Sequence, residues 1–496
     1  MKFLLPLACL SLLSSPIMAD DYQDWLKKTQ SDFQSYLDEN DKAFVQFLQK
    51  KWTPVDVRPA QQRDPEPKPI EPPQVPVDKT PQPDTPLAES PPMDDIPAET
   101  PVVTLPPVQA PEPVDEPLAT APEMPAPQPD STPDSGRKPA FTFYGSPVYA
   151  ETPAALHKTY RGKLNSKNIA AYWTALASSD HKGTVASLLN SAQQLQLNSW
   201  GTALLFDRYA RSLHRDDNSR VLLSWFLLVK AGFDARVAYN DRVHLLMTAD
   251  QALFGVTYFR LDGQTYYAVN LNDKPLAPGK VFTYEGQHDS GRLALDFSEP
   301  VRFVPAGESE EKTFAFHYAD QQYRIQLSYP QRYVSYFASY PQLSLPNYFK
   351  AGLPAVTAQS LLDQLKPVVA GQSEKEAVNR LLRFVQTAFS YRTDDEQFHE
   401  ENYLFPLETL HYPYSDCEDR AALFAWLTES LLGLDVVILD YPGHVATAVA
   451  FNGEVKGDQW PLNNRRYVVA DPTYVNASVG MTMPAYAGVR PTIHTF

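Results

Sequence analysis

The chain has little cysteine, no surplus of basic charge and no long apolar run. It contains two cysteines among 496 residues, which excludes a disulfide framework. The formal net charge of −16 argues against a nucleic acid or an anionic membrane surface as a partner, since both prefer basic surfaces. No segment reaches the roughly 18 apolar residues of a transmembrane helix. An HExxH motif, a cysteine pair and a glycine-rich phosphate loop are also absent, so we predict no metal and no cofactor.

The first 19 residues have the pattern of a signal peptide. Lys2 precedes an apolar run over residues 3–13, and small residues lead to a cleavage site at Ala19. A lipoprotein would need Cys9 as its modified residue, but the eight residues before it leave almost no apolar region. We therefore expect a cleaved signal peptide over residues 1–19 and a periplasmic or secreted protein.

Two segments of different character follow the signal peptide. Residues 20–52 predict an amphipathic helix, which either docks on a partner or packs on the main body. Residues 53–139 hold most of the 46 prolines and predict an extended, solvated linker. The linker is either a spacer or a ligand for a proline-reading partner.

The remaining chain contains an apparent internal repeat. Trp225 and Trp426 lie in similar apolar helical patterns, and Gly232 and Gly433 follow them at the same offset (426 − 225 = 201; 433 − 232 = 201). Strand-like runs follow each glycine, over residues 235–239 and 436–439, which favours a duplication, although helix, glycine, strand is also a pattern that arises by chance. We predict one copy over residues 140–275, a β-rich connecting region over residues 276–345 with a hairpin at 313–329, and a second copy over residues 346–496. In the second copy, Ser373 and Glu376 predict a capping box at the start of a helix.

Cys417 is the chain's one cysteine after signal-peptide removal. A lone cysteine in an oxidising compartment is either a buried apolar residue or a reactive one. Ser415 and Glu418 predict a capping box that places Cys417 in the first turn of a helix ending at Gly433. The positive end of that helix favours a thiolate, and its free N–H groups can hold an oxyanion.

A base and an orienting acid follow at regular intervals. His444 opens an apolar strand and Asp471 ends another, each 27 residues after the previous candidate (444 − 417 = 27; 471 − 444 = 27). Alone, His444 would be an ordinary strand-end histidine, and Asp471 would start an Asp-Pro turn. Together, Cys417, His444 and Asp471 predict a nucleophile, base and acid triad.

These residues resemble the core of the transglutaminase-like superfamily. The resemblance rests on the segments SDCEDRA at 415–421, GHV at 443–445 and ADPT at 470–473, and it is strongest over residues 372–472. It implies an α+β, papain-like fold, with the cysteine helix packed on an antiparallel sheet. Ser415 departs from the family's frequent glycine-rich turn, which puts the local loop shape in doubt.

The resemblance implies an exported cysteine enzyme that acts on amide bonds of a protein or peptide substrate through a thioester. We prefer a peptidase or amidase to a transamidase, and the alternative is a binding or scaffold protein that retains the fold. In the first copy, the offset places Asp216, Val243 and Asn270 at the three catalytic positions, and a one-residue gap would substitute His244. We therefore predict a degenerate first copy that serves as a scaffold or binds substrate.

Overall fold

The computed structural model describes residues 39, 41–61, 72–76, 138–269, 271, 276–277, 279–286, 292–298, 301–303 and 305–496. The predicted signal peptide and most of the proline-rich linker lie outside these residues. The described chain combines helices with antiparallel sheets, in agreement with the predicted α+β class. Among these residues, no helix is both long enough and apolar enough to cross a membrane.

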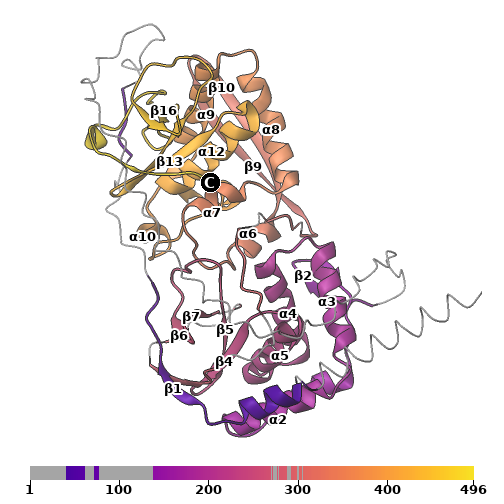
Figure 1. Cartoon of the computed structure of the whole chain (residues 1–496). Helices are drawn as coiled ribbons and strands as arrows, with labels where there is room; N and C mark the ends of the chain where they lie inside the picture. Colours follow the sequence, from indigo (N-terminus) through magenta and orange to yellow (C-terminus); the bar gives the residue numbers. More distant parts are fainter. Residues whose placement is uncertain are drawn as a thin grey trace, which may run out of the picture.

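A first unit places four helices against a sheet (Figure 1). Its helices are α2 (Ser166–Ala177), α3 (Lys182–Gln194), α4 (Ser199–Leu213) and α5 (Asp217–Lys230), preceded by the short hairpin β2 (Phe141–Phe143) and β3 (Ser146–Val148) and by the 3-10 turn η2 (Ala154–His157). Trp225 of α5 meets Trp173 of α2 with ring centroids 4.6 Å apart, and both rings are buried. The helix that the sequence predicted around Trp225 therefore lies at the centre of this unit.

The sheet of the first unit has the order β1-β8-β4-β5-β7-β6. Its strands are β1 (Thr53–Asp56), β4 (Ala235–Tyr239), β5 (Val243–Met247), β6 (Tyr258–Leu261), β7 (Gln264–Ala268) and β8 (Lys280–Thr283), and every pairing is antiparallel. The strand predicted over residues 235–239 is confirmed with its predicted bounds.

The N-terminal region is attached to this unit. Residues 41–48 are helical, and Phe44 packs edge-on against Trp173 at 4.7 Å. The segment after this helix corrects the predicted start of the linker at residue 53, because β1 forms a sheet edge by pairing with β8. Prolines are tolerated in an edge strand, where an N–H group can be missing without cost to the ladder. Of the two interpretations of the N-terminal helix, packing on the main body holds for residues 41–48.

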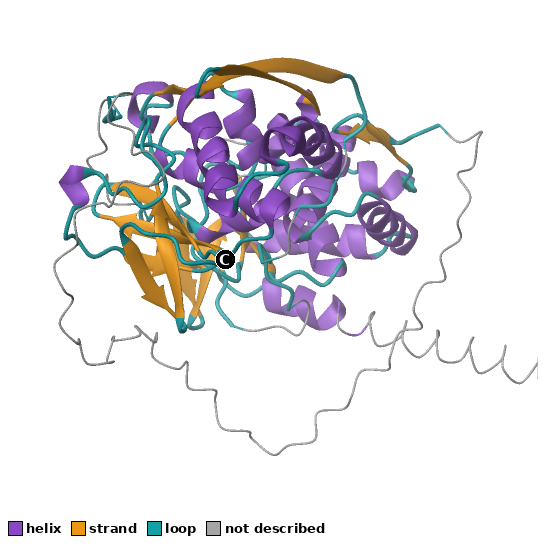
Figure 2. Cartoon of the chain, turned by 90° about the horizontal axis from the view of Figure 1, so that it is seen from above, coloured by secondary structure: helices purple, strands orange, loops and turns teal. Residues whose placement is uncertain are grey.

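The second unit is layered. A hairpin of β9 (Ser309–Tyr318) and β10 (Gln321–Pro330) confirms the hairpin predicted between the two copies. It packs on α8 (Ala355–Val369) and α9 (Glu374–Ala388), so it belongs to this unit rather than to a separate connecting region. In Figure 2 the hairpin lies along one side of the helices, and a sheet lies on the other.

The remaining elements of the second unit surround the helix α12 (Cys417–Leu432). The others are α6 (Gln331–Phe337), α7 (Pro346–Ala351), α10 (Asp394–Gln397), α11 (Pro406–His411), η3 (Pro484–Tyr486) and the two-residue strands β11 (Ser390–Tyr391) and β12 (Tyr414–Ser415). α12 contacts α9 on one side and the five-stranded sheet on the other. The helix is therefore enclosed, and residues 421–425 are all fully buried.

The second sheet has the order β15-β16-β14-β13-β17. Its strands are β13 (Val436–Tyr441), β14 (His444–Val449), β15 (Gln459–Leu462), β16 (Arg465–Ala470) and β17 (Thr492–His494). Taken from its other edge, the order is β17-β13-β14-β16-β15, which matches β8-β4-β5-β7-β6 of the first sheet. In both, the strand that comes last in the chain lies at one end, followed by one hairpin and then by a second hairpin. In each unit these five strands follow the helix that carries the repeated tryptophan, whereas β1 precedes it.

Candidate functional site

Cys417 is the first residue of α12. The helix starts one residue later than the predicted capping box, because Asp416 is its N-cap and the Asp416 N–H donates to Asp419 Oδ2 at 3.3 Å. Ser415 is held elsewhere: it pairs with Tyr391 in the two-strand bridge. The predicted cap at Ser415 is therefore wrong by one position, while the position of Cys417 in the first turn and the end of the helix at Gly433 are both observed.

The structure brings the three predicted catalytic residues together. His444 opens β14 directly after the turn at Pro442 and Gly443, and its Nε2 lies 2.8 Å from Asp471 Oδ2. The backbone N–H of Val445 donates to Cys417 Sγ at 3.5 Å, which places the thiol beside the histidine backbone. With Nε2 bonded to the carboxylate, the imidazole nitrogen that can accept a proton is Nδ1, which is buried and has no hydrogen-bond partner within the described part of the chain.

The Asp471 carboxylate is held in place from two sides. Its Oδ1 accepts the N–H groups of Thr473 and Tyr474 at 2.9 and 3.2 Å, which leaves Oδ2 for the histidine. Gln386 of α9 donates its Nε2 to the carbonyls of Asp471, Tyr474 and Ala477 at 3.0, 2.8 and 3.1 Å. The sequence analysis missed Gln386. The available signal was an amide adjoining the apolar face of a helix that precedes the cysteine.

Arg420 ties the cysteine helix to α9. Its guanidinium is buried and donates to the carbonyls of Gln386 and Phe389 at 3.4 and 2.9 Å, and to Ser415 Oγ at 3.2 Å. Burial lowers the pKa of Arg420 to about 10. Because these contacts span α9 and α12, Arg420 fixes the start of the cysteine helix relative to the residue that supports Asp471.

The site is closed to solvent. Cys417 and His444 have no exposed surface, and Asp471 is 2 % exposed. The ring of Tyr486 stacks on the His444 imidazole at 5.0 Å with an interplanar angle of 21°, and its hydroxyl donates to the Gly443 carbonyl at 3.4 Å. A substrate carbonyl therefore reaches the thiol only after covering side chains move.

A group of carboxylates lies beside the thiol. Glu418 Oε2 accepts from Cys417 Sγ at 3.1 Å. Two overlapping triplets keep their carboxylate oxygens within 4.8 Å of one another: Asp394 with Asp416 and Asp419, and Asp394 with Glu401 and Glu418. Oxygen ligands of this kind suit a hard divalent cation, and protons or hydrogen bonds can satisfy them as well. The sequence analysis, which predicted no metal, did not anticipate this arrangement.

The described residues of the first unit do not form the same constellation. At the repeat offset, the position of Cys417 is taken by Asp216, which caps α5 by accepting the Ser219 N–H at 2.8 Å. His244 bonds Asn240 Oδ1 at 3.0 Å rather than a carboxylate, and burial lowers its pKa to about 4. Val243 pairs with Tyr239 at the start of β5. Asn270 lies outside the described residues.

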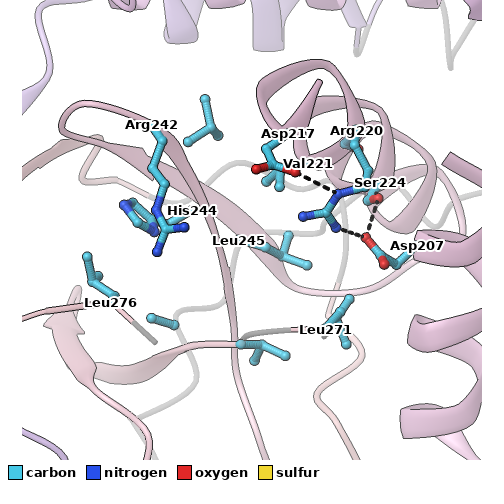
Figure 3. A pocket seen from close by; sticks show the side chains of 13 residues that line it. Asp207, Asp217, Arg220, Val221, Ser224, Arg242, His244, Leu245, Leu271 and Leu276 are labelled. Atoms are coloured by element: carbon cyan, nitrogen blue, oxygen red, sulfur yellow. Dashed lines mark hydrogen bonds and ion pairs between the residues drawn. The ribbon is translucent and has the colours of Figure 1, made fainter. Parts of the chain in front are cut away.

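A pocket occupies the corresponding end of the first unit. Figure 3 shows Arg242 and His244 on one side of it and an ion pair between Arg220 and Asp207 on the other. Apolar side chains such as Leu245 lie between the two polar groups. The described residues of this pocket include no nucleophilic sulfur, so the chemistry available at the first copy differs from that around Cys417.

No protein-family model, no curated protein and no solved structure matches this chain. The function must therefore be inferred from the chemistry and geometry of the residues themselves.

Proposed function

We propose that the chain is an exported cysteine enzyme that acts on amide bonds of a protein or peptide. The observation that carries the proposal is the alignment of Cys417, His444 and Asp471: a thiol on the first residue of a helix, a histidine beside it, and a carboxylate 2.8 Å from the histidine's far nitrogen. This order of helix cysteine, strand histidine and strand aspartate supports a transglutaminase-like, papain-like core over residues 346–496.

In the proposed reaction, His444 Nδ1 takes the thiol proton and Cys417 Sγ attacks the amide carbonyl. The N-terminus of α12 stabilises the oxyanion that forms. The C–N bond then breaks, the amine leaves with the proton from His444, and a thioester remains on Cys417. Water, activated by the same histidine, attacks the thioester and releases the acid and the free thiol. Asp471 keeps the imidazole oriented throughout.

Hydrolysis is preferred to transamidation because an exported enzyme meets abundant water. If an amine took the place of water in the second step, the same thioester would yield a new amide. Supplying a labelled amine to the reaction and measuring its incorporation into the product distinguishes these two outcomes.

A second candidate is a binding or scaffold protein that retains the fold without the reaction. The complete burial of Cys417 and His444 favours it, since a working nucleophile must be reached by substrate. We therefore choose an experiment that measures reactivity and access together.

The test is the rate of iodoacetamide alkylation of the mature protein as a function of pH, followed by mass spectrometry. Cys417 is the one thiol in a chain that starts at Asp20, so the signal has a single source. For an enzyme, His444→Ala slows alkylation near neutral pH by about 10²-fold or more, because the base that makes the thiolate is lost. Asp471→Ala has a smaller effect, since it acts through the histidine. Equal, slow alkylation of all three proteins supports the scaffold.

Activity gives the second arm of the test. Cys417→Ala should abolish amide cleavage in a peptide library while leaving thermal unfolding nearly unchanged, because alanine suits the first turn of a helix. Full cleavage by Cys417→Ala would refute the proposed nucleophile.

We further propose that the two units arose by duplication. The matching strand orders and the shared offset of the Trp225 and Trp426 helices support this, and the absence of a sulfur nucleophile among the described residues of the first copy suits a scaffold role. Superposing α5 with β4, β5 and β7 on α12 with β13, β14 and β16 tests it directly.

A further inference from the structure

A short piece of the proline-rich region lies against the second unit. Residues 72–76, here called the linker strand, form a bridge to Val475, which follows the strand β16. Figure 1 shows this short indigo-to-purple segment beside the second unit. Val475 N–H donates to the Pro73 carbonyl at 3.0 Å, and Val75 N–H donates to the Val475 carbonyl at 2.9 Å. This alternation is the hydrogen bonding of a parallel β bridge, made by an extended peptide added to an exposed backbone edge.

One side chain of the linker strand is buried in an apolar cluster. Val75 is 6 % exposed and clusters with Tyr474, Ala477 and Met483. The neighbouring Gln74 side chain is exposed, as expected for an extended segment whose side chains alternate. The contact therefore buries the side chain of one branched apolar residue, and its hydrogen bonds are made by the peptide backbone of the linker strand.

A third hydrogen bond comes from the receiving loop. Asn476 Nδ2 donates to the Val75 carbonyl at 3.0 Å. Asn476 has a positive φ of 65°, and its own carbonyl accepts from Arg383 of α9 at 3.3 Å. The loop that receives the linker strand is thus also held by α9, through a contact that does not involve the linker strand.

The same loop is continuous with the candidate active site. Tyr474 packs on Val75, while its backbone N–H donates to the Asp471 carboxylate. Tyr486, which stacks on His444, also packs against the Val75 cluster. A peptide in this position therefore packs on Tyr474, whose backbone N–H bonds Asp471, within a cluster that Tyr486, the residue stacked on His444, also joins.

We propose that this surface is a subsite for the extended peptide segment of a substrate, with a pocket for a branched apolar residue, and that residues 73–75 occupy it in cis. This subsite rests on the proposed function, because only an enzyme has a substrate to bind there. A purely structural strap is the alternative. The N-terminal region has a separate attachment to the first unit, through Phe44 and through β1, so it does not need the linker strand to stay bound.

The expected affinity follows from the size of the contact. Burial of one valine side chain contributes on the order of 2 kcal/mol, with three hydrogen bonds of about 1 kcal/mol each, before the cost of ordering the segment. An interaction of this size is weak between separate molecules. A tethered segment, however, acts at an effective concentration near the millimolar range, so it occupies the subsite far more often than a free peptide at micromolar concentration does.

The test displaces the tethered segment and measures binding of a free one. The probe is a fluorescein-labelled peptide that copies residues 70–78, and its binding is followed by fluorescence anisotropy. Val75→Asp in the full mature chain places a charge in the apolar pocket, whereas Gln74→Asp adds the same charge at the exposed neighbouring position and serves as the matched control. We expect the peptide to bind Val75→Asp several-fold more tightly than it binds Gln74→Asp or the wild type, because the tethered segment no longer competes with it.

Three outcomes decide the proposal. Tighter binding to Val75→Asp, together with loss of binding when the peptide itself carries aspartate at the valine position, supports the subsite. Equal binding to all three proteins overturns it. A large drop in thermal stability of Val75→Asp relative to Gln74→Asp, without peptide binding, also overturns it and makes the linker strand structural.

The binding assay does not depend on catalysis, so it tests the subsite independently of the proposed enzymatic activity. Repeating it on a Cys417→Ala background removes any turnover of the probe. If peptide binds but no protein cleaves amides, the subsite stands and the scaffold function replaces the enzyme. If cleavage occurs but no peptide binds, the enzyme stands and the subsite is wrong. If both hold, Val75→Asp should lower KM for peptides with a branched apolar residue and leave kcat unchanged.

Discussion

Glu408 offers a sharp electrostatic test because it is a buried carboxyl without a cationic partner among its described contacts. It lies on α11, is 5 % exposed, and its Oε2 accepts the Phe405 N–H at 3.1 Å. Burial raises its pKa from 4.5 to about 8, and the backbone hydrogen bond opposes this only in part. We consider the replacement Glu408→Gln, which preserves the shape and can still accept that hydrogen bond.

The sign of the effect follows from which state holds the proton. The folded protein keeps Glu408 protonated between pH 4.5 and 8, whereas the unfolded chain releases the proton above pH 4.5. The raised pKa therefore contributes stability that is complete below pH 4.5 and is lost as the pH rises through about 8. With 1.36 kcal/mol per pKa unit, the part lost between roughly pH 5 and pH 8 is on the order of 3 to 4 kcal/mol. Glutamine does not titrate and shows no such loss.

The assay is urea unfolding of the mature chain at several values between about pH 5 and pH 8, followed by tryptophan fluorescence. Other groups titrate in this range, so the quantity of interest is the difference in unfolding free energy between Glu408→Gln and wild type. This difference should move in favour of the variant as the pH rises. Glu454→Gln, at an exposed glutamate, is the control. Parallel curves for wild type and Glu408→Gln would refute the reasoning.

Four further outcomes are expected. Gln386→Leu removes a side-chain donor from three carbonyls, of which that of Tyr474 keeps the Ala477 N–H, and should cost about 2 to 4 kcal/mol in urea unfolding, with a loss of any amidase activity larger than the stability loss explains. Asp207→Ala removes the buried partner of Arg220, whose ion pair with Asp217 at 3.8 Å involves an exposed carboxylate, and should cost about 3 to 5 kcal/mol by the same measurement. Trp52→Ala should cost a similar amount, because the ring is 3 % exposed; an unchanged melting temperature would show that the N-terminal region does not stabilise the first unit. N-terminal sequencing of the exported protein should begin at Asp20, and a lipid-bearing start at Cys9 would contradict the cleaved signal peptide.

Local patterns in the sequence predicted the elements that carry the site. The capping box at Ser373 and the glycine stop at Gly433 mark ends of α9 and α12 as observed. The alternation over residues 313–329 predicted the β9–β10 hairpin, because one face of that hairpin is buried on helices. Hydrophobic periodicity and helix-capping residues act over a few neighbouring residues, so tertiary contacts do not change the elements that they predict.

The sequence predictions were wrong where a contact with a residue distant in the chain determines the local structure. Ser415 would cap a helix in isolation, but in the fold it lies in the β12 bridge and accepts a hydrogen bond from Arg420, and the cap moves to Asp416. The start of the linker was misplaced because proline content alone does not reveal that β8 offers an edge to β1. Gln386 gave no pattern either, since its three acceptors come from a loop roughly 90 residues further along the chain.

The contacts of the N-terminal region with the rest of the protein have a consequence for the proline-rich part of the chain. Residues 53–61 and 72–76 lie on the body, and the chain is on the body again from residue 138. The described residues on either side of the segment 77–137 therefore lie on the same body. A protease cut within this segment should leave two polypeptides that remain together as a noncovalent complex. The shorter one would then act as a subunit in its own right, exchangeable at a rate set by the contacts of Phe44, Trp52 and Val75.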